Sequence, residues 1–463
     1  MEDPRIGEIL RAARLELPAG ATLAVSGSDP VLRSRFFAGE VAAIALGLVG
    51  TAAARLHTLR SGQSQAVAVD TTAAATTLLG FLFQKSAAGF DLARHRNAWT
   101  ELYPAGDGRW VHLHGGFPRL AAGLADLLEG SDAPEAVAAA VQRWQAADLE
   151  EAIAERGLCG AMVRTSREWA AHPQGLALAD RPAVTIERIG DSPAEPLAPS
   201  TRPLADVRAL DLTRVLAGPS CGRTLAEHGA DVLRIGAERL PSIEPFVVDT
   251  GRGKRNAFLD LADASDAAQL RTLVSDADVF TQGYRPGALT RHGFGPEAVA
   301  ELRPGIVYVS IDCYGADGPW SGRAGWEQLA QSATGIAAAE GGWTQPGDPP
   351  PQLIPAAATD YTTGALAAFG VLTALARRAE EGGSWHVRAS LCQTAMWLTR
   401  LGADCDPEDA AGFGDVASRM ATCETEWGSL THLAPAVQME LTPPRWERSP
   451  APLGSHAPAW LPR

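Results

Sequence analysis

The segment Pro355-Ala-Ala-Ala-Thr-Asp-Tyr-Thr-Thr-Gly364 leads directly into an apolar run, 365–375, and the rest of the chain is organised around it. Asp360 is the one charged residue in the segment, and no further charge follows until Arg377. An Asp at a helix start commonly caps the helix, because its oxygen accepts a backbone N–H of the first turn. The helix dipole would also keep such a carboxylate ionised. Asp360 is therefore either a helix cap or a carboxylate that carries chemistry.

Residues 205–400 alternate regularly between apolar strands and helices. Buried strands separated by helices are typical of a parallel sheet that is covered by helices on both faces. The expected strands are 207–212, 230–235, 278–281 and 306–310, and the expected helices are 218–228, 264–274, 296–302 and 326–339. We therefore expect an α/β protein with a Rossmann-like parallel sheet domain over about 205–400.

The first 200 residues favour a smaller α+β domain. Apolar periodicity predicts helices at 6–15, 38–56 and 73–83 and within 118–157, and a strand at 66–70. Asp107-Gly108, inside the stretch 102–114, predicts a β-hairpin. The Pro- and Ser-rich stretch 192–203 predicts a linker. These signals divide the chain into regions 1–200, 205–400 and a C-terminal tail, 401–463.

An internal repeat relates the two larger regions. The unit 38–75 (helix, glycine turn, strand, helix) matches 361–396 in order and length. The matched glycines are Gly47 with Gly370 and Gly62 with Gly382, after a slip of about three residues. In this alignment Phe37 stands opposite Asp360, so the first copy is expected to lack the carboxylate. The first 200 residues are then a non-catalytic complement whose apolar helices need a partner surface.

The composition of the chain argues against a nucleic-acid-binding, a membrane-spanning or a secreted protein. The chain of 463 residues has a formal net charge of −14, which opposes binding to the phosphates of nucleic acid. The most apolar run, 41–54, is shorter than the roughly 20 residues of a membrane-spanning helix, and the first residues lack a secretory signal pattern. We therefore expect a cytoplasmic protein. The six scattered cysteines predict neither a metal site nor a disulfide framework.

Three loops that follow successive expected strands carry residue types that bind phosphate. The turn 211–219 places backbone N–H groups at a helix start. The run Gly251-Arg-Gly-Lys-Arg255 gathers three cations, and the stretch from Tyr284 to His292 adds an aromatic ring and two more cations. A solvated basic turn is the simpler interpretation of 251–255, and a phosphate-bearing ligand is the other. Together the loops indicate one nucleotide-like ligand.

In their order along the chain, these motifs resemble those of the family III CoA-transferases, the formyl-CoA and carnitine type (CaiB/BaiF family). That family also contains α-methylacyl-CoA racemases. The matching stretches are 210–219, 229–235, 252–255, 285–289, 315–319, 323–327 and Thr359-Asp360, within about 205–400.

The resemblance implies that Asp360 attacks an acyl-CoA thioester and becomes an aspartyl-CoA thioester by way of a mixed anhydride. It also implies that Glu327 lies near the reacting carbonyl. The implied coenzyme A site is lined by Val215, Leu216, Ala217, Lys254, Arg255, Tyr284, Arg291 and His292. No metal is implied. The implied partners are an acyl-CoA and a carboxylic acid, and neither nucleic acid nor a membrane is expected. The resemblance also implies a homodimer, in which the first 200 residues complete the second part either within one chain or across an interlocked dimer.

The chain departs from the family's order, because material resembling the small domain precedes the Rossmann-like part. No glycine run is longer than Gly115-Gly116 or Gly341-Gly342, so the family's mobile glycine loop has no counterpart. Two alternatives therefore stand beside the transferase: a CoA-binding protein without catalysis, and an acyl-CoA racemase or isomerase. The racemases place a His after the Arg-Ala-Gly stretch, where this chain has Trp326, which cannot exchange a proton at neutral pH.

Overall fold

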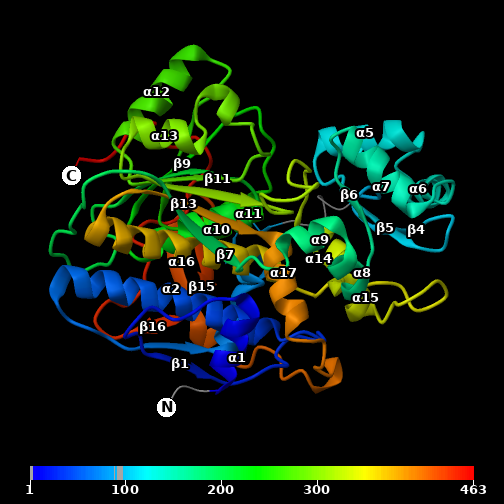
Figure 1. The fold of residues 1–463 in the computed structure, drawn as a ribbon, viewed down its shortest axis with the longest axis horizontal. Helices are drawn as coiled ribbons and strands as arrows, with labels where there is room; N and C mark the ends of the chain where they lie inside the picture. The colour runs from blue at the N-terminus through cyan, green and yellow to red at the C-terminus, as the bar shows by residue number, and fades with distance from the viewer. Residues whose placement is uncertain (1–3, 88, 91–96, 463) are drawn as a thin grey trace.

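A computed structural model describes residues 4–87, 89–90 and 97–462. Its largest sheet has the strand order β10-β9-β8-β11-β12-β13-β7; six strands are parallel, and β7 runs antiparallel to β13 (Figure 1). The strands are β7 Val184–Gly190, β8 Arg208–Leu212, β9 Asp231–Gly236, β10 Lys254–Phe258, β11 Val279–Gln282, β12 Val307–Asp312 and β13 Ser384–Ser390. The prediction of an α/β protein with a large, mostly parallel sheet is confirmed.

Apolar side chains bury both faces of this sheet. On β8, Leu210 and Leu212 belong to a core with α12 (Ala264–Ser275) and α13 (Pro296–Leu302). Ala209, the residue before Leu210, belongs to the opposite core, which includes α10 (Ala217–Glu227) and α16 (Ala358–Glu381). Because both faces are covered, most side chains of these strands are buried, and the charged ones among them, such as Asp211 and Lys254, are paired inside the fold.

A smaller, three-stranded sheet has the same arrangement of strands and long helix as one edge of the large sheet. β1 (Leu23–Ser26) and β2 (Val67–Asp70) are parallel and joined through α2 (Ala38–Ser61), and β16 (Val437–Met439) pairs antiparallel with β2. The same arrangement recurs in β12, α16, β13 and β7. The helices α2 and α16 have 24 residues each and pack against each other.

The structure corrects the register of the internal repeat. Gly50 of α2 lies so near β2 that an added Cβ would be 2.5 Å from Val67 Cγ1, and a Cβ on Gly370 of α16 would be 2.4 Å from Val387 Cγ1. These matched close approaches align the copies without a slip. The residue opposite Asp360 is therefore Glu40 and not Phe37, so the prediction that the first copy lacks a carboxylate is wrong.

The helix α2 is longer than the predicted apolar run 41–54. By length and composition it could cross a membrane, and it is the one such helix in the described part of the chain. However, 89% of its most apolar window is buried inside the protein. In this fold α2 is a core helix.

The predicted hairpin is present as β4 (Leu102–Pro104) and β5 (Trp110–Leu113), with Gly108 at φ +76° in the turn. A third strand, β6 (Gly160–Met162), pairs antiparallel with β5. The expected helical stretch 118–157 is three helices, α5 Pro118–Leu128, α6 Pro134–Val141 and α7 Ala146–Glu155. Pro134 separates two of them because a proline can begin a helix but not continue one. This small α+β unit lies at the right of Figure 1.

The observed units do not follow the predicted boundaries near residues 200 and 400. Strand β7, from the first region, forms an edge of the large sheet, and β16 completes the small one. β14 (Met420–Thr425) and β15 (Gly428–Leu433) form a third sheet with β3 (Lys85–Ser86). Near the C-terminus, the His456 N–H donates to the Asn256 carbonyl of β10 at 2.8 Å. The predicted tail is an integral part of the fold.

The other helices are α1 Pro4–Ala13, α3 Thr71–Thr77, α4 Gly80–Phe83, α8 Ser166–Ala171, α9 Pro173–Leu178, α11 Glu244–Thr250, α14 Glu327–Thr334, α15 Ile336–Gly341 and α17 Leu391–Arg400. The expected helix 326–339 divides at Gly335, whose φ of +100° favours glycine. The remaining short 3-10 turns are Thr290–His292, Pro407–Asp409 and Ala417–Arg419.

Candidate active site

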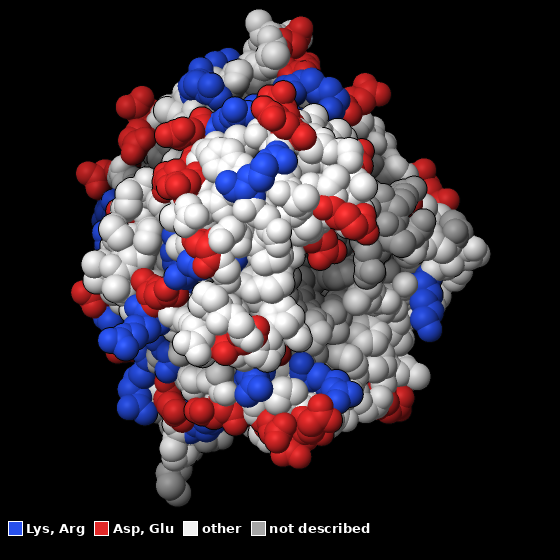
Figure 2. All heavy atoms as spheres, turned by 90° about the vertical axis from the view of Figure 1, so that its right-hand side faces the viewer, with Lys and Arg blue, Asp and Glu red and all other residues white. Residues whose placement is uncertain are grey.

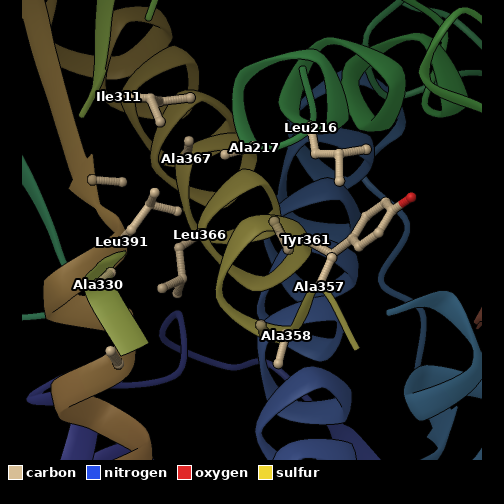
Figure 3. Packing of buried hydrophobic residues seen from close by; sticks show 14 of the residues in the cluster. Leu216, Ala217, Ile311, Ala330, Ala357, Ala358, Tyr361, Leu366, Ala367 and Leu391 are labelled. Atoms are coloured by element: carbon tan, nitrogen blue, oxygen red, sulfur yellow. The ribbon is translucent and has the colours of Figure 1, made fainter. Parts of the chain in front are cut away.

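Asp360 does not cap its helix. α16 begins at Ala358, and Asp360 lies within the first turn. Its buried carboxylate instead accepts the backbone N–H of Ala217, the first residue of α10. Figure 3 shows Ala217 and Leu216 near the start of α16, where Ala357, Ala358 and Tyr361 lie. The capping interpretation is therefore wrong, and two helix N-termini converge at this carboxylate.

Glu327 is the second buried acid of the site. It is the first residue of α14, and its Oε1 accepts the Thr359 N–H at 2.9 Å and a hydrogen bond from Gln331 Nε2 at 3.2 Å. Thr359 directly precedes Asp360, so both acids lie at the start of α16. The structure thus brings together the two residues to which the resemblance assigned the chemistry.

Burial raises the pKa of both acids. The pKa of Asp360 rises to about 7, although the Ala217 N–H acts in the opposite direction. Burial, and next the charge of Asp360, raises the pKa of Glu327 well above its usual range. The helix end does not hold the pKa of Asp360 at its ordinary value, because the loss of water outweighs the favourable helix end. Burial therefore favours the protonated form of both acids compared with exposed carboxyls.

An open cleft of about 1010 Å³ lies where β8, β11 and β12 end. Six arginines line it: Arg119, Arg214, Arg239, Arg285, Arg291 and Arg323. Tyr284 and Arg291, which the resemblance assigned to coenzyme A, are both in its wall. The wall residue Trp326 directly precedes Glu327, and Arg214 lies shortly before Ala217. The cleft therefore borders the turns that hold the two acids.

Lys254 and Arg255 do not line this cleft. The buried Lys254 Nζ donates to Asp211 Oδ2 and to the Pro219 carbonyl, both at 2.6 Å. Arg255 is ion-paired with Asp231 at 2.9 Å. Of the expected basic loop 251–255, Lys254 and Arg255 begin strand β10, and the buried Arg252 is paired with Asp249, so neither a solvated turn nor a phosphate loop describes it. Ion pairing inside the sheet explains these two cations.

The other residues that the resemblance assigned to the coenzyme A site are Val215, Leu216, Ala217 and His292. Val215, at φ +69°, lines a small enclosed cavity beside Arg214, and Leu216 is buried. Positive φ is rare for a β-branched residue and marks a strained turn. Ala217 contributes its N–H to Asp360. His292 is exposed on a 3-10 turn and is not among the cleft residues.

The small α+β unit contributes aromatic side chains that sequence reasoning missed. The rings of His114 and Trp326 are stacked with centroids 5.1 Å apart, and the Phe117 ring lies 5.3 Å from that of Trp326. The Arg214 guanidinium lies 5.2 Å from the Phe117 ring centroid. Burial lowers the pKa of His114 to about 4, so the ring is neutral at pH 7. In the sequence, the one feature that could have pointed to these aromatic contacts is the pair Gly115-Gly116, which lies between His114 and Phe117.

A second pair of acids lies at the start of α2. Asp29 Oδ2 accepts the Glu40 N–H at 2.8 Å, much as Glu327 accepts the N–H of Thr359. Burial raises the pKa of Asp29 to about 6. Glu40 is ion-paired with Arg5 at 2.6 Å. The first copy thus has a carboxylate, Glu40, at the position of Asp360, and this carboxylate is paired with a cation.

No group of three or more His, Cys, Asp or Glu residues in the described ranges is arranged to hold a metal ion. The arginine-rich lining of the cleft suits an anionic organic ligand.

The model of CoA-transferase family III matches residues 19–193 and 204–411. The acetyl-coenzyme A transferase nodX of Hypoxylon pulicicidum is 37% identical over 327 residues, which are 65% of this chain and 54% of that protein. An acyl-CoA transferase of Gibberella moniliformis is 34% identical over 361 residues, or 73% of this chain and 62% of that protein. A solved CAIB/BAIF family protein from Brucella suis is 26% identical, covering 50% of this chain and 65% of that one with a TM-score of 0.40.

The chain spans between about half and three-fifths of the length of these two curated relatives. The family model, in contrast, matches most of the chain on both sides of the stretch 194–203. The chain belongs to CoA-transferase family III.

Proposed function

We propose that this protein transfers coenzyme A from an acyl-CoA to a carboxylic acid, with Asp360 as the nucleophile. The observation that carries the proposal is the buried pair of Asp360 and Glu327 beside an arginine-lined cleft. A carboxyl with a pKa near 7 is ionised to a useful extent at neutral pH, and its removal from water keeps the carboxylate reactive. Membership of the family supports the same chemistry.

The proposed reaction exchanges one carboxylate for another. Ionised Asp360 attacks the thioester carbonyl carbon of the donor, the C–S bond breaks, and CoA leaves as a thiolate. The thiolate then attacks the Asp360 carbonyl carbon of the mixed anhydride, which gives an aspartyl-CoA thioester and releases the donor acid as a carboxylate. The acceptor carboxylate reverses both steps and restores Asp360. The Ala217 N–H and the protonated Glu327 would stabilise the negative charge that develops on the reacting oxygens.

We further propose that the cleft holds the phosphates and adenine of coenzyme A. The six parallel strands have the order of the doubly wound, Rossmann-like sheets that bind nucleotides at their carboxyl ends. Several cleft arginines are already engaged; Arg239, for example, pairs with Asp260, and Arg323 pairs with Glu151. Arg291 has no ion pair or hydrogen-bonded side-chain partner within the described ranges, so its guanidinium is available to a phosphate.

Arg291→Ala is expected to weaken CoA binding about tenfold, because a hydrogen bond to a charged group contributes roughly 1.5–3 kcal/mol. Its melting temperature should stay unchanged, since the exposed side chain supports no internal contact. Isothermal titration with CoA at fixed salt measures the effect. Arg167→Ala, which removes an exposed arginine from α8, is the matched control. Equal affinities in the two variants would place the phosphates elsewhere.

The proposed function is tested by mixing a panel of acyl-CoAs with isotopically labelled carboxylic acids and following the products by mass spectrometry. Transfer should yield a CoA thioester of the labelled acid. The same mixtures in heavy water should show no deuterium at the α-carbon, because Trp326 stands where the racemases have a His. Deuterium uptake without transfer would favour a racemase. CoA binding without either reaction would favour a non-catalytic binding protein.

The partners that we propose are small molecules. Figure 2 shows Lys and Arg interspersed with Asp and Glu on one face, without the continuous basic stripe that nucleic-acid binding surfaces have. A cytoplasmic location and a homodimeric assembly are further proposals, and the family resemblance is what supports the dimer.

A further inference from the structure

A buried arginine without a partner lies beside the cleft. Arg234 is on β9, where its register partner on β8 is Asp211. Only 7% of its surface is exposed, yet no hydrogen bond or ion pair joins its guanidinium to another residue in the described part of the chain. An arginine does not lose its proton in a protein, and a buried charge without a partner is strongly unfavourable. Arg234 therefore needs an anion that the chain itself does not supply.

The acid that acts most strongly on Arg234 is already bonded to other donors. Burial lowers the pKa of Arg234, and the charge of Asp211 opposes this effect. However, Asp211 Oδ2 accepts Lys254 Nζ at 2.6 Å, and its Oδ1 accepts the N–H and the hydroxyl of Thr213. One carboxylate thus stands near two buried cations and is bonded only to Lys254.

Arg234 lines the small enclosed cavity that Val215 also lines. This cavity adjoins the cleft, because Phe117, Arg214 and Pro241 are in the walls of both. The Arg214 guanidinium donates to the Pro241 carbonyl and has no ion pair with a described residue. The described residues that line the cavity include two arginines and no acid. It is therefore a recess that suits the anionic end of a ligand bound in the cleft.

The size and position of the cavity favour a carboxylate over a phosphate. Its volume is about 20 Å³, and a single water needs roughly 10–15 Å³, so the oxygens of a flat carboxylate fit where a tetrahedral phosphate is too bulky. Ala217, which donates its N–H to Asp360, is two residues after Val215, and two residues span at most about 7 Å. Figure 3 shows Leu216 and Ala217 beside the start of α16. In coenzyme A the pantetheine arm separates the thiol from the phosphates, so an anionic group this near to Asp360 belongs to the acyl part.

We propose that the acids exchanged by this protein are dicarboxylic, and that Arg234, assisted by Arg214, binds the carboxylate that does not react. This inference rests on the proposed CoA transfer at Asp360. One carboxyl group of the acid reacts there, while the other accepts hydrogen bonds from Arg234 and neutralises its charge. A monocarboxylic acid would leave that buried charge unpaired, so Arg234 would determine specificity.

The first test measures the binding of free acids to the full-length protein by isothermal titration at fixed salt. The probes are the unbranched dicarboxylic acids from malonate to adipate, each compared with its monoamide, which keeps the shape but lacks one charge. The diacid that binds best should bind roughly ten- to hundredfold more tightly than its monoamide, because hydrogen bonds to charged groups are strong. Arg234→Met should remove this preference, and Arg234→Lys should keep part of it. Equal binding of every diacid and its monoamide to the wild type would overturn the proposal.

Arg208→Met is the matched control for Arg234→Met. Arg208 is also 7% exposed and lies on the adjacent strand β8, but it is paired with Asp276. Arg208→Met should lower the melting temperature and keep the preference for diacids. Arg234→Met should leave the ligand-free protein at least as stable as the wild type, because it removes a buried charge that has no partner. A fall in melting temperature as large as that of Arg208→Met would give Arg234 a structural role and contradict the proposal.

Coenzyme A and a transfer assay separate the remaining possibilities. CoA alone should bind equally to the wild type and Arg234→Met; a large loss of CoA affinity with an unchanged preference for diacids would assign the cavity to a phosphate and overturn the proposal. Transfer to monocarboxylic acids as fast as to diacids would retain the CoA-transferase and reject the dicarboxylic class. Diacid binding that depends on Arg234, without any transfer, would retain the carboxylate site and reject the transfer.

Discussion

Asp360→Asn is expected to lower the rate of CoA transfer on the order of 10⁴-fold, because losing the residue that forms the covalent intermediate typically costs that much or more. CoA binding should be nearly unchanged, since the cleft arginines remain. In the wild type, the aspartyl-CoA thioester formed from a reactive acyl-CoA should be trapped by hydroxylamine. Mass spectrometry of peptides should place the hydroxamate on Asp360.

The matched control for this variant is Glu40→Gln, which changes the equivalent acid of the first copy. It breaks the ion pair with Arg5, so it should lower stability and leave turnover intact. The sign of the pH dependence gives an independent check. Only the ionised carboxylate attacks, so turnover should fall as the pH drops below the Asp360 pKa of about 7. Turnover that persists in Asp360→Asn would exclude the covalent route.

Residues 205–463 expressed without the first region are expected to be insoluble or molten. Helix α2 alone buries Val41, Ile44, Leu48, Val49 and Leu56. Each such side chain contributes roughly 1.5–3 kcal/mol, so their loss approaches the whole net stability of about 5–15 kcal/mol. The large sheet would also lose its edge strand β7. Adding 1–204 in trans should restore a cooperative melt, which calorimetry or circular dichroism records.

A nicked protein is the control for this experiment. A protease site inserted at Ala198-Pro199, where both side chains are exposed, allows both regions to fold together before the chain is cut. The cut protein should keep its cooperative melt, because β7 ends before the nick and stays paired with β13. If 205–463 instead folds alone and transfers CoA, the first region has another role.

Local sequence predicted the sheet better than it predicted the environment of single charges. Buried strands such as β8 and β12 appear as apolar runs, because both of their faces are covered. Lys254 looked like part of a solvated or phosphate-binding loop, because its partner Asp211 is distant in the sequence and close only in the folded sheet. Asp360 is a similar case. The resemblance could indicate that Asp360 belongs to the site, but its raised pKa depends on burial beside Glu327, which is distant in the sequence.

The register of the repeat shows why an Ala-rich helix is hard to align from its sequence. Such helices offer few landmarks, so Gly47 appeared to match Gly370. In the structure Gly50 is the true counterpart, because only a glycine lets each helix approach the valine of its following strand. A tertiary contact therefore fixed a correspondence that residue types alone left ambiguous.

A buried acid at the start of each of the two matched helices, Glu40 on α2 and Asp360 on α16, has an evolutionary consequence. In a symmetric homodimer every substitution occurs twice, so a change that suits one copy of a site is imposed on the other. Here Glu40 can mutate separately from Asp360. The Arg5 pair shows such a divergence: one acid is part of the scaffold, and the other ionises near neutral pH. Two matched helices on one chain can thus become different from each other, which two copies of one site in identical chains cannot do by mutation.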